Sequence, residues 1–213
     1  MVAVLLLALT RPAQADFVQT FITDFQNGAV IPDGNLTGWS DTRTLSGAPS
    51  GPITNVSVTL DLSGGWNGDL YAYLVHDSGF AVLLNRVGRE TGHSPGYGDA
   101  GMNVVLNDAA SVNLHSYGGG GVPTGPYAPD GRNISPLSSP ATFTLTSPSA
   151  MLDSFNGLNA NGSWTLFIVD VSSGDQSTVT SWGLDIAAVP EPASMVLFLI
   201  GVVGLYWRQS KQA

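Results

Sequence analysis

The three histidines are the residues of this 213-residue chain that could act as a general base near neutral pH. Hydrolysis by an activated serine also needs that serine beside the imidazole and a carboxylate that orients the ring. His76 follows an apolar segment, His93 lies in a glycine-rich segment and His115 follows Leu114. We interpret the three as independent surface residues and predict that the chain is not an enzyme.

Four aspartates, Asp69, Asp108, Asp170 and Asp175, lie where strands are expected to end or the chain to turn. Carboxylate oxygens are ligands for hard cations such as Ca²⁺. The sequence has no Asp-x-Asp-x-Asp-Gly calcium loop. Two interpretations remain open. Some of the four bind a calcium ion, or each caps a turn through hydrogen bonds to the backbone. No other cofactor is predicted.

Three tyrosines, Tyr97, Tyr117 and Tyr127, lie in the long segments 86–102 and 116–140, which hold most of the glycines and prolines. Loops of this length carry function or are disordered, and the run from Gly118 to Gly121 favours disorder. The three rings are candidates for stacking on sugars. Single exposed aromatic residues are also common on protein surfaces, which is the alternative.

The elements that must position these residues are predicted to be strands. In the segment ITNVSVTLDL, Val56, Val58, Leu60 and Leu62 alternate with polar residues, as expected for a strand with one buried face. The segment GDLYAYLVH is apolar on both faces, which predicts a central strand. Further strands are expected at 80–84, 141–146, 164–171 and 179–186, and no helix is expected between the two ends of the chain.

The composition limits the kinds of partner. The chain has no cysteine, and residues 16–188 carry four basic side chains against 15 acidic ones. Such a strongly acidic domain repels phosphate backbones, so we exclude nucleic acid as a partner. The length fits a single core with additional segments at its ends.

The first residues have the features of an export signal. An apolar stretch from Val2 to Leu9 is followed by Ala13-Gln14-Ala15, a small-x-small triplet suited to signal peptidase. Cleavage after Ala15 would leave Asp16 as the first mature residue. The alternative is an ordinary N-terminal strand, although Pro12 interrupts strand alternation.

The last residues predict a transmembrane helix. Residues 193–207 are uncharged and largely apolar, Tyr206 and Trp207 suit a membrane interface, and Arg208 and Lys211 suit the cytoplasmic side. This orientation places the core on the non-cytoplasmic side of the membrane. A buried terminal helix is the alternative, because apolar stretches of this length also occur in cores.

The C-terminal segment resembles the PEP-CTERM sorting signal of Gram-negative bacteria that make extracellular polysaccharide. The resemblance rests on Pro190, Glu191 and Pro192, the apolar segment after them and the basic end that begins at Arg208. It implies that an exosortase-type membrane enzyme recognises the Pro-Glu-Pro segment. The two prolines hold that segment extended, which leaves it open to an enzyme.

The central part, from about Ile53 to Ile186, is similar to the P domain, or P/Homo B domain, of proprotein convertases and bacterial subtilisin-like proteases. The matching positions are Trp66 with Gly68-Asp69-Leu70, Asp108-Ala109-Ala110, Gly162 with Trp164-Thr165-Leu166, Asp170 and Trp182. The resemblance implies a jelly-roll β-sandwich that stabilises a neighbouring protease and does not itself cut peptide bonds.

The sequence therefore predicts an all-β jelly-roll sandwich at 16–188, a signal helix at 1–15 and a sorting segment with a transmembrane helix at 189–213. We expect an exported, non-catalytic module of the cell surface or extracellular matrix. Its partners are expected to be the sorting enzyme and extracellular polysaccharide. The alternatives are an accessory domain for a separate secreted subtilisin-like protease and a glycan-binding jelly roll.

Overall fold

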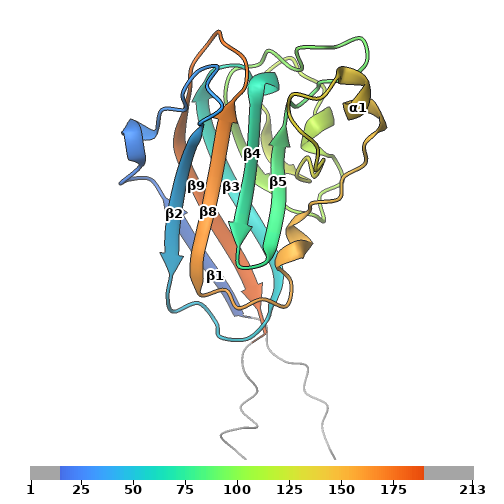
Figure 1. Cartoon of the computed structure of the whole chain (residues 1–213). Helices are drawn as coiled ribbons and strands as arrows, with labels where there is room; N and C mark the ends of the chain where they lie inside the picture. Colours follow the sequence, from blue (N-terminus) through green and yellow to red (C-terminus); the bar gives the residue numbers. More distant parts are fainter. Residues whose placement is uncertain (1–14, 190–213) are drawn as a thin grey trace, which may run out of the picture.

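Two β-sheets pack face to face in the computed structural model, which describes residues 15–189 (Figure 1). One sheet has the strand order β1-β9-β3-β6-β7 and the other β2-β8-β4-β5. Neighbouring strands are antiparallel except β6 and β7. The prediction of an all-β protein is confirmed. The strands are β1 (Ala15–Phe21), β2 (Trp39–Leu45), β3 (Ile53–Gly64), β4 (Leu70–His76), β5 (Gly79–Asn85), β6 (Met102–Leu106), β7 (Thr124–Tyr127), β8 (Gly162–Asp170) and β9 (Ser177–Ala188).

The core lies between the two sheets and is built by the predicted alternation. In β3, the side chains of Val56, Val58, Leu60 and Leu62 are buried. In β9, the other long strand of the same sheet, alternate residues from Trp182 onward are buried in the same way. The segment expected to be central is β4, which pairs with β8 on one side and β5 on the other.

The expected strand at 141–146 is wrong, because these residues lie in the helix α1 (Pro140–Leu145). Proline at the first helical position is favourable there, since its fixed φ suits a helix and its missing N–H costs no hydrogen bond. The Thr146 amide closes the turn on the Thr142 carbonyl at 3.0 Å. Phe143 is buried while Leu145 is 84% exposed, so tertiary packing of one aromatic side chain outweighs the β-propensity of the segment.

Apart from α1, the helical residues of the described part are four short 3₁₀ turns, η1 (Gln26–Ala29), η2 (Asn67–Asp69), η3 (Leu114–Ser116) and η4 (Leu152–Phe155). Within residues 15–189 no helix has the length and apolar character needed to cross a bilayer. The predicted signal helix (1–15) and the predicted sorting segment with its transmembrane helix (189–213) lie outside the described residues, apart from Ala15, which begins strand β1, and Val189.

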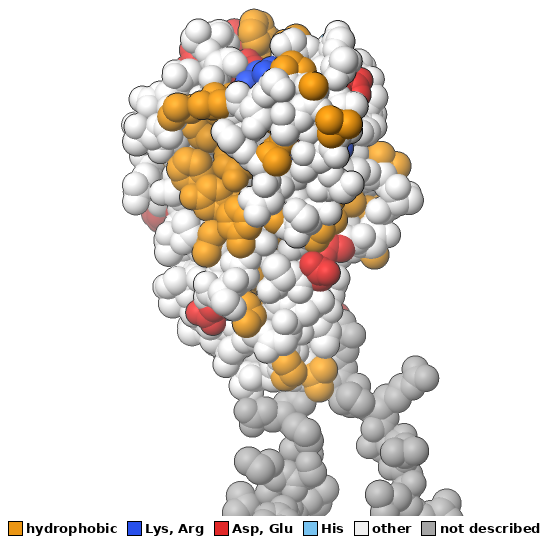
Figure 2. Space-filling view, turned by 45° about the vertical axis from the view of Figure 1, so that its right-hand side comes forward, with side chains coloured by type: hydrophobic (Ala, Val, Ile, Leu, Met, Phe, Trp, Pro, Cys, Tyr) orange, Lys and Arg blue, Asp and Glu red, His pale blue; other side chains and the backbone are white. Residues whose placement is uncertain are grey.

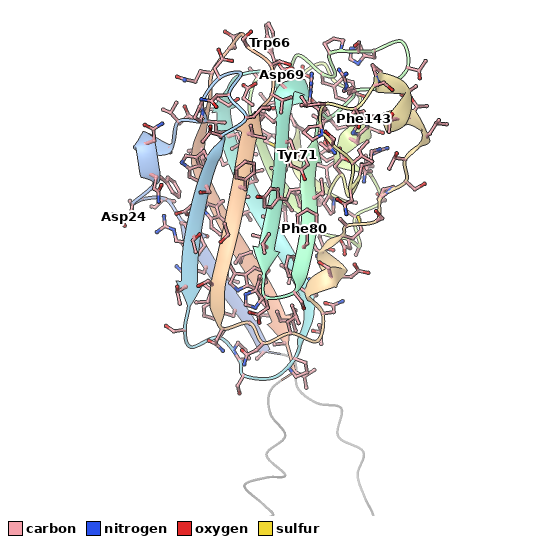
Figure 3. All side chains as sticks on the ribbon, viewed as in Figure 1. Asp24, Trp66, Asp69, Tyr71, Phe80 and Phe143 are labelled. Atoms are coloured by element: carbon pink, nitrogen blue, oxygen red, sulfur yellow. The ribbon has the colours of Figure 1, made fainter. Side chains whose placement is uncertain are left out.

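Both ends of the described chain lie at the same end of the sandwich. Ala15, the first residue of β1, pairs with Ala188, the last residue of β9 (Figure 1). The opposite end carries the loop with Trp66 and Asp69 (Figure 3). We call this opposite end the distal end, and it is the part of the domain farthest from the chain termini.

Candidate functional site

The histidines are held by structural contacts. His76 and His115 are buried, so the prediction of surface positions is wrong for both. The two ring nitrogens of His76 face the carbonyl oxygens of Ser163 and Asn159, at 3.1 and 2.6 Å, and the ring stacks on Trp164 with centroids 4.1 Å apart. Strand β8 thus brings a partner to His76 that is distant in sequence.

His115 contacts a carboxylate without forming a catalytic set. Its Nδ1 lies 2.6 Å from Asp130, and its Nε2 faces the Arg89 carbonyl oxygen at 3.1 Å. The nitrogen that would activate a serine is therefore in contact with the backbone. Asp130 is also paired with Arg132, at 3.2 Å.

The segment Gly92–Gly96, with the sequence GHSPG, has the Gly-x-Ser-x-Gly spacing of a nucleophile elbow. Such an elbow needs a strand before the serine and a helix after it. Here the segment is a loop, closed by the two backbone hydrogen bonds between Glu90 and His93. His93 Nδ1 faces the Gly88 carbonyl oxygen at 2.8 Å. The local pattern therefore does not place Ser94 in a catalytic geometry.

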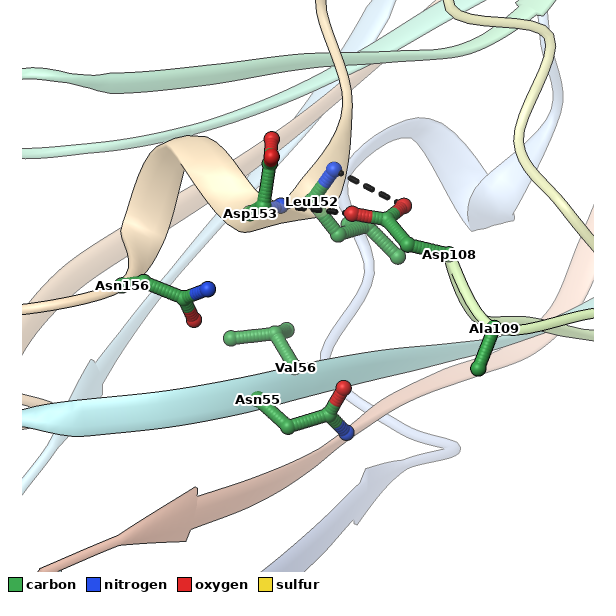
Figure 4. A pocket seen from close by; sticks show the side chains of 7 residues that line it. All are labelled: Asn55, Val56, Asp108, Ala109, Leu152, Asp153 and Asn156. Atoms are coloured by element: carbon green, nitrogen blue, oxygen red, sulfur yellow. Dashed lines mark hydrogen bonds between the residues drawn. The ribbon is translucent and has the colours of Figure 1, made fainter.

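Asp108 lies in a cleft of about 260 Å³ at the edge of the sandwich (Figure 4). Its carboxylate accepts hydrogen bonds from the Leu152 and Asp153 amides, at 3.1 and 2.7 Å. Burial raises the pKa of Asp108, and these two amides oppose the shift. Asp108 thus ties η4 to the turn after β6, and the oxygen atoms that would face a ligand already hold backbone donors.

Asp69 and Asp170 lie together at the distal end, where Leu70 pairs with Asp170 at the junction of β4 and β8. The Arg86 guanidinium donates to Asp69 at 3.1 Å and to the Gly68 carbonyl. Burial outweighs this neighbour and raises the pKa of Asp69. We call Asp69, Arg86 and Asp170 the distal cluster.

Asp170 is fully buried and only partly satisfied. Its Oδ1 accepts from the Ser172 amide at 3.1 Å, whereas its Oδ2 has no hydrogen-bond partner within residues 15–189. Burial raises the pKa of Asp170 to about 6, and the charges of Asp69 and Asp33 add to the shift. Asp175 is exposed in the turn that follows. The four predicted metal ligands therefore lie in separate places, apart from Asp69 and Asp170.

Calcium binding at Asp69 and Asp170 stays a proposal. No group of three or more acidic or histidine side chains suited to a metal ion occurs in the described part of the chain, so a cation would also need backbone oxygens. Arg86 already neutralises Asp69. The free Oδ2 of Asp170 is the atom that fits the role of ligand, because a cation would compensate its buried charge.

We expect calcium to raise the thermal midpoint of the full chain in mild detergent at pH 7.5, relative to a chelator. At about a hundredfold excess over Kd, the midpoint should rise by about 5–10 °C. The Asp170→Asn variant should lose this response, and Asp77→Asn, an exposed aspartate at the β4–β5 turn, should keep it. Equal midpoints with calcium and with chelator would reject the site.

The three predicted sugar-stacking tyrosines form one aromatic cluster. The Tyr97 and Tyr117 ring centroids are 4.7 Å apart, and those of Tyr117 and Tyr127 are 6.4 Å apart. All three rings are half-buried and pack against the core. The Tyr117 hydroxyl donates to Asp99 at 2.7 Å, and burial raises its pKa. Sugar stacking by these rings stays a prediction.

The glycine run from Gly118 to Gly121 follows a defined path, contrary to the expectation of disorder. The Asp99 carboxylate accepts hydrogen bonds from the Gly120 and Gly121 amides, at 3.0 and 2.7 Å. One acidic side chain thus holds both the Tyr117 hydroxyl and the run.

A second aromatic group, on the outer face of the β2-β8-β4-β5 sheet, was not predicted as a site. It consists of Tyr71 and Tyr73 of β4, Phe80 of β5 and Phe167 of β8. We call these four residues the aromatic face. The alternation of Tyr71 and Tyr73 is visible in the sequence, where it indicates only the second apolar side of a central strand.

Residues 188–211 match the PEP-CTERM protein-sorting motif. This match confirms that the chain carries a PEP-CTERM sorting motif, and Pro190, Glu191, Pro192 and Arg208 lie within its range. The roles expected of these four residues stay a prediction. A motif of this kind indicates export in a Gram-negative bacterium, with a transient membrane-anchored stage before placement at the surface or outside the cell. No curated protein matches the chain.

Among solved structures, the chain is similar to a serine protease of Aeromonas sobria in two crystal structures. The match to the complex of this protease with its chaperone has a TM-score of 0.47 and 15% identity, and covers 84% of this chain and 27% of the other. The match to the protease alone has a TM-score of 0.45 and 14% identity, and covers 84% and 28%. At these TM-scores the similarities establish neither a shared family nor a shared function.

Proposed function

We propose that this chain is a non-catalytic module of the cell surface or extracellular matrix, exported by its N-terminal signal and processed by an exosortase at Pro190-Glu191-Pro192. The observation that carries the proposal is the sorting motif at residues 188–211, which begins where β9 ends. The domain that is sorted would be the jelly-roll β-sandwich at 16–188.

The position of the chain ends supports display of the domain. Because Ala15 pairs with Ala188, an anchor that follows β9 attaches at one end of the sandwich and leaves the distal end and both outer sheet faces accessible (Figure 1).

The contacts of the histidines support a non-catalytic role. Each of His76, His93 and His115 has a ring nitrogen against a backbone carbonyl oxygen, and neither His76 nor His115 has a ring nitrogen left for a hydroxyl nucleophile. A general base must reach the proton that it removes. These imidazoles instead form hydrogen bonds that hold neighbouring segments of the domain together.

The sorting role predicts a change in location when the Pro-Glu-Pro segment is replaced. We expect the triple variant Pro190→Ala, Glu191→Ala, Pro192→Ala to stay in the membrane fraction of the producing cells at its unprocessed mass, because alanines allow a helix where the prolines hold an extended segment. Fractionation with intact-mass measurement reads this result.

A matched control replaces the same residue types elsewhere. The Glu90→Ala, Pro148→Ala variant changes two exposed residues of the domain and should reach the surface or medium like the unmodified chain. If the triple variant is processed and released as the control is, exosortase recognition at this segment is wrong.

The resemblance to P domains keeps an accessory role with a separate secreted subtilisin-like protease as a prediction. A pull-down distinguishes this accessory role from the main proposal: the purified full chain is immobilised and exposed to the medium of producing cells, and the material that it retains is identified. Enrichment of a protease, read by mass spectrometry, would favour this alternative, and enrichment of polysaccharide without protease would favour the matrix module.

A further inference from the structure

The aromatic face forms a continuous row of rings across three strands. The centroid of Tyr73 lies 4.8 Å from that of Phe167, 5.4 Å from that of Phe80 and 5.9 Å from that of Tyr71. Tyr73 and Phe167 are stacked, with 21° between their planes. Because β4 lies between β8 and β5, Tyr73 is the centre of the row.

The rings are fixed by the sheet beneath them. Val169 pairs across the strands with Tyr71 and Val82 with Tyr73, and both valines are buried. The four rings themselves are half-buried. A binding surface made of such side chains loses little conformational entropy when a ligand is bound, since each ring has two rotatable bonds and is already packed.

The strand residues of this face carry hydroxyl groups and no charge, and the ion pair of Asp130 and Arg132 lies beside Asn85, at the end of the face near Tyr71. Rows of cross-strand neighbours extend from the rings to β2, where Thr42 lies opposite Thr165 with their hydroxyl oxygens 2.9 Å apart. Neither the Tyr71 nor the Tyr73 hydroxyl has a hydrogen-bond partner within residues 15–189. The uncharged neighbours in these rows are Ser40, Thr42, Thr44, Val75, Phe80, Val82, Asn85, Ser163, Thr165, Phe167 and Val169.

The space-filling view agrees with this description. Figure 2 shows hydrophobic side chains gathered in one broad area toward the left of the view, with no blue or red atoms inside it. Figure 3 shows Tyr71 and Phe80 on β4 and β5, on the side of the sheet that faces the viewer. In a domain with four basic and 15 acidic side chains, an uncharged sheet face of this extent is a local exception.

We propose that the aromatic face binds a neutral polysaccharide chain. The C–H groups on the face of a sugar ring are apolar and slightly positive, so they pack on the negative faces of aromatic rings. The Tyr71 and Tyr73 hydroxyls can hydrogen-bond to sugar hydroxyls, and the Thr42–Thr165 pair keeps further donor and acceptor capacity for the same purpose. The absence of charge on the face complements a ligand that carries none, since a charged polymer would be desolvated there without a partner.

A protein partner or a second copy fits this face less well. Protein interfaces gain most of their energy from protruding anchors that enter pockets on the partner. Here all four rings are half-buried, and each packs against another ring of the row, so none is an isolated anchor. The inference rests on the proposed function in one respect, because export places the domain outside the cell, where such a polymer occurs. Binding itself does not depend on sorting.

Retention of the purified full chain, in mild detergent, on beads that carry polysaccharide tests the proposal. The probes are cellulose, mannan and the neutral fraction of the polysaccharide of the producing cells, with alginate as the acidic comparison. We expect retention on at least one neutral probe and none on alginate. Failure to bind any neutral probe, or equal binding to alginate, would overturn the proposal.

Variants locate the binding surface. Tyr73→Ala should bind about tenfold more weakly, and Tyr73→Phe, which keeps the ring, should stay within about twofold. Thr42→Glu places a charge at an exposed position of the same face, so it should also weaken binding about tenfold even if Tyr73→Ala fails to fold. The matched control Val18→Glu places the same charge on the other sheet, where Val18 is 66% exposed, and should bind normally.

Two further outcomes would overturn the proposal. Loss of binding in Tyr127→Ala with full binding in Tyr73→Ala would assign the ligand to the cluster of Tyr97, Tyr117 and Tyr127. Sedimentation that shows a dimer abolished by Thr42→Glu, with polysaccharide retention unchanged, would assign the face to a second copy. If the sorting proposal is wrong, the Pro-Glu-Pro variant will be processed and released like its control, and bead retention will be unaffected.

Discussion

Replacement of Arg86 by methionine is expected to lower the free energy of unfolding by about 3–5 kcal/mol. The Arg86 guanidinium is buried and donates to Asp69, to the Gly68 carbonyl and, at 3.4 Å, to the Pro95 carbonyl. Methionine fills much of the same volume but leaves a buried carboxylate and carbonyl oxygens without donors. The loss should be measured by urea denaturation at pH 7.5, followed by tryptophan fluorescence.

A double-mutant cycle separates the charge pair from the loss of packing. Asp69→Asn removes the charge that Arg86 neutralises, so the variant Arg86→Met, Asp69→Asn should be less destabilised than the sum of the two single variants. Additive effects within about 0.5 kcal/mol would mean that Asp69 and Arg86 do not stabilise each other, despite their 3.1 Å contact.

The free energy of unfolding is expected to depend on pH through the titration of Asp170. The pKa of Asp170 is raised from 3.8 to about 6 in the folded protein because the carboxyl group is buried. A raised pKa means that the folded state holds the proton more tightly than the unfolded state. The free energy of unfolding should therefore fall by about 3 kcal/mol from this group as the pH rises from about 4 to about 7. The pKa values of Asp69 and Asp108 shift in the same direction.

Urea denaturation between pH 4 and pH 7.5, with chelator present, measures this dependence. Asp170→Asn should flatten it, because asparagine does not titrate, and Asp77→Asn at the exposed β4–β5 turn is the matched control. A slope in Asp170→Asn equal to that of the unmodified chain would show that the buried carboxyl of Asp170 is not its source.

The strands that could be predicted contain a run of apolar residues, which alternate with polar residues in β3 and occupy both faces in β4 and β5. In β3, each of Val56, Val58, Leu60 and Leu62 is separated from the next by one polar residue, so period and burial agree. β1, β2, β6 and β7 were not predicted. β1, β2 and β7 lie at sheet edges and β6 is the neighbour of β7, and sequences such as TGPY in β7 contain few of the residues that indicate a strand.

The helix α1 shows the limit of local propensity. ATFTLT alternates as a strand should, but no neighbouring strand accepts it, and the burial of Phe143 in a turn of helix determines the conformation. The contacts among the candidate site residues cannot be predicted from local sequence either. Tyr97, Tyr117 and Tyr127 could be named from loop composition, but their contact depends on Asp99 and on η3, which only the folded chain brings together.

The buried histidines could not be predicted for a related reason. His76 ends β4 and looks like a surface residue in the sequence, and its partners Asn159 and Ser163 follow more than 80 positions later. The distal cluster could not be predicted either, because Asp69, Arg86 and Asp170 come together only when β4, β5 and β8 pair.

The pairing of β1 with β9 determines when the domain can finish folding. β9 lies between β1 and β3, so the five-stranded sheet lacks a central member until residue 188 is available. Contacts between the first and last strands close the longest possible loop of the domain and form slowly. A chain synthesised from its N-terminus therefore stays incomplete until β9 has emerged, immediately ahead of the sorting motif. Until then β1 has no strand to pair with, so the strand that completes the five-stranded sheet is the one that directly precedes the sorting motif.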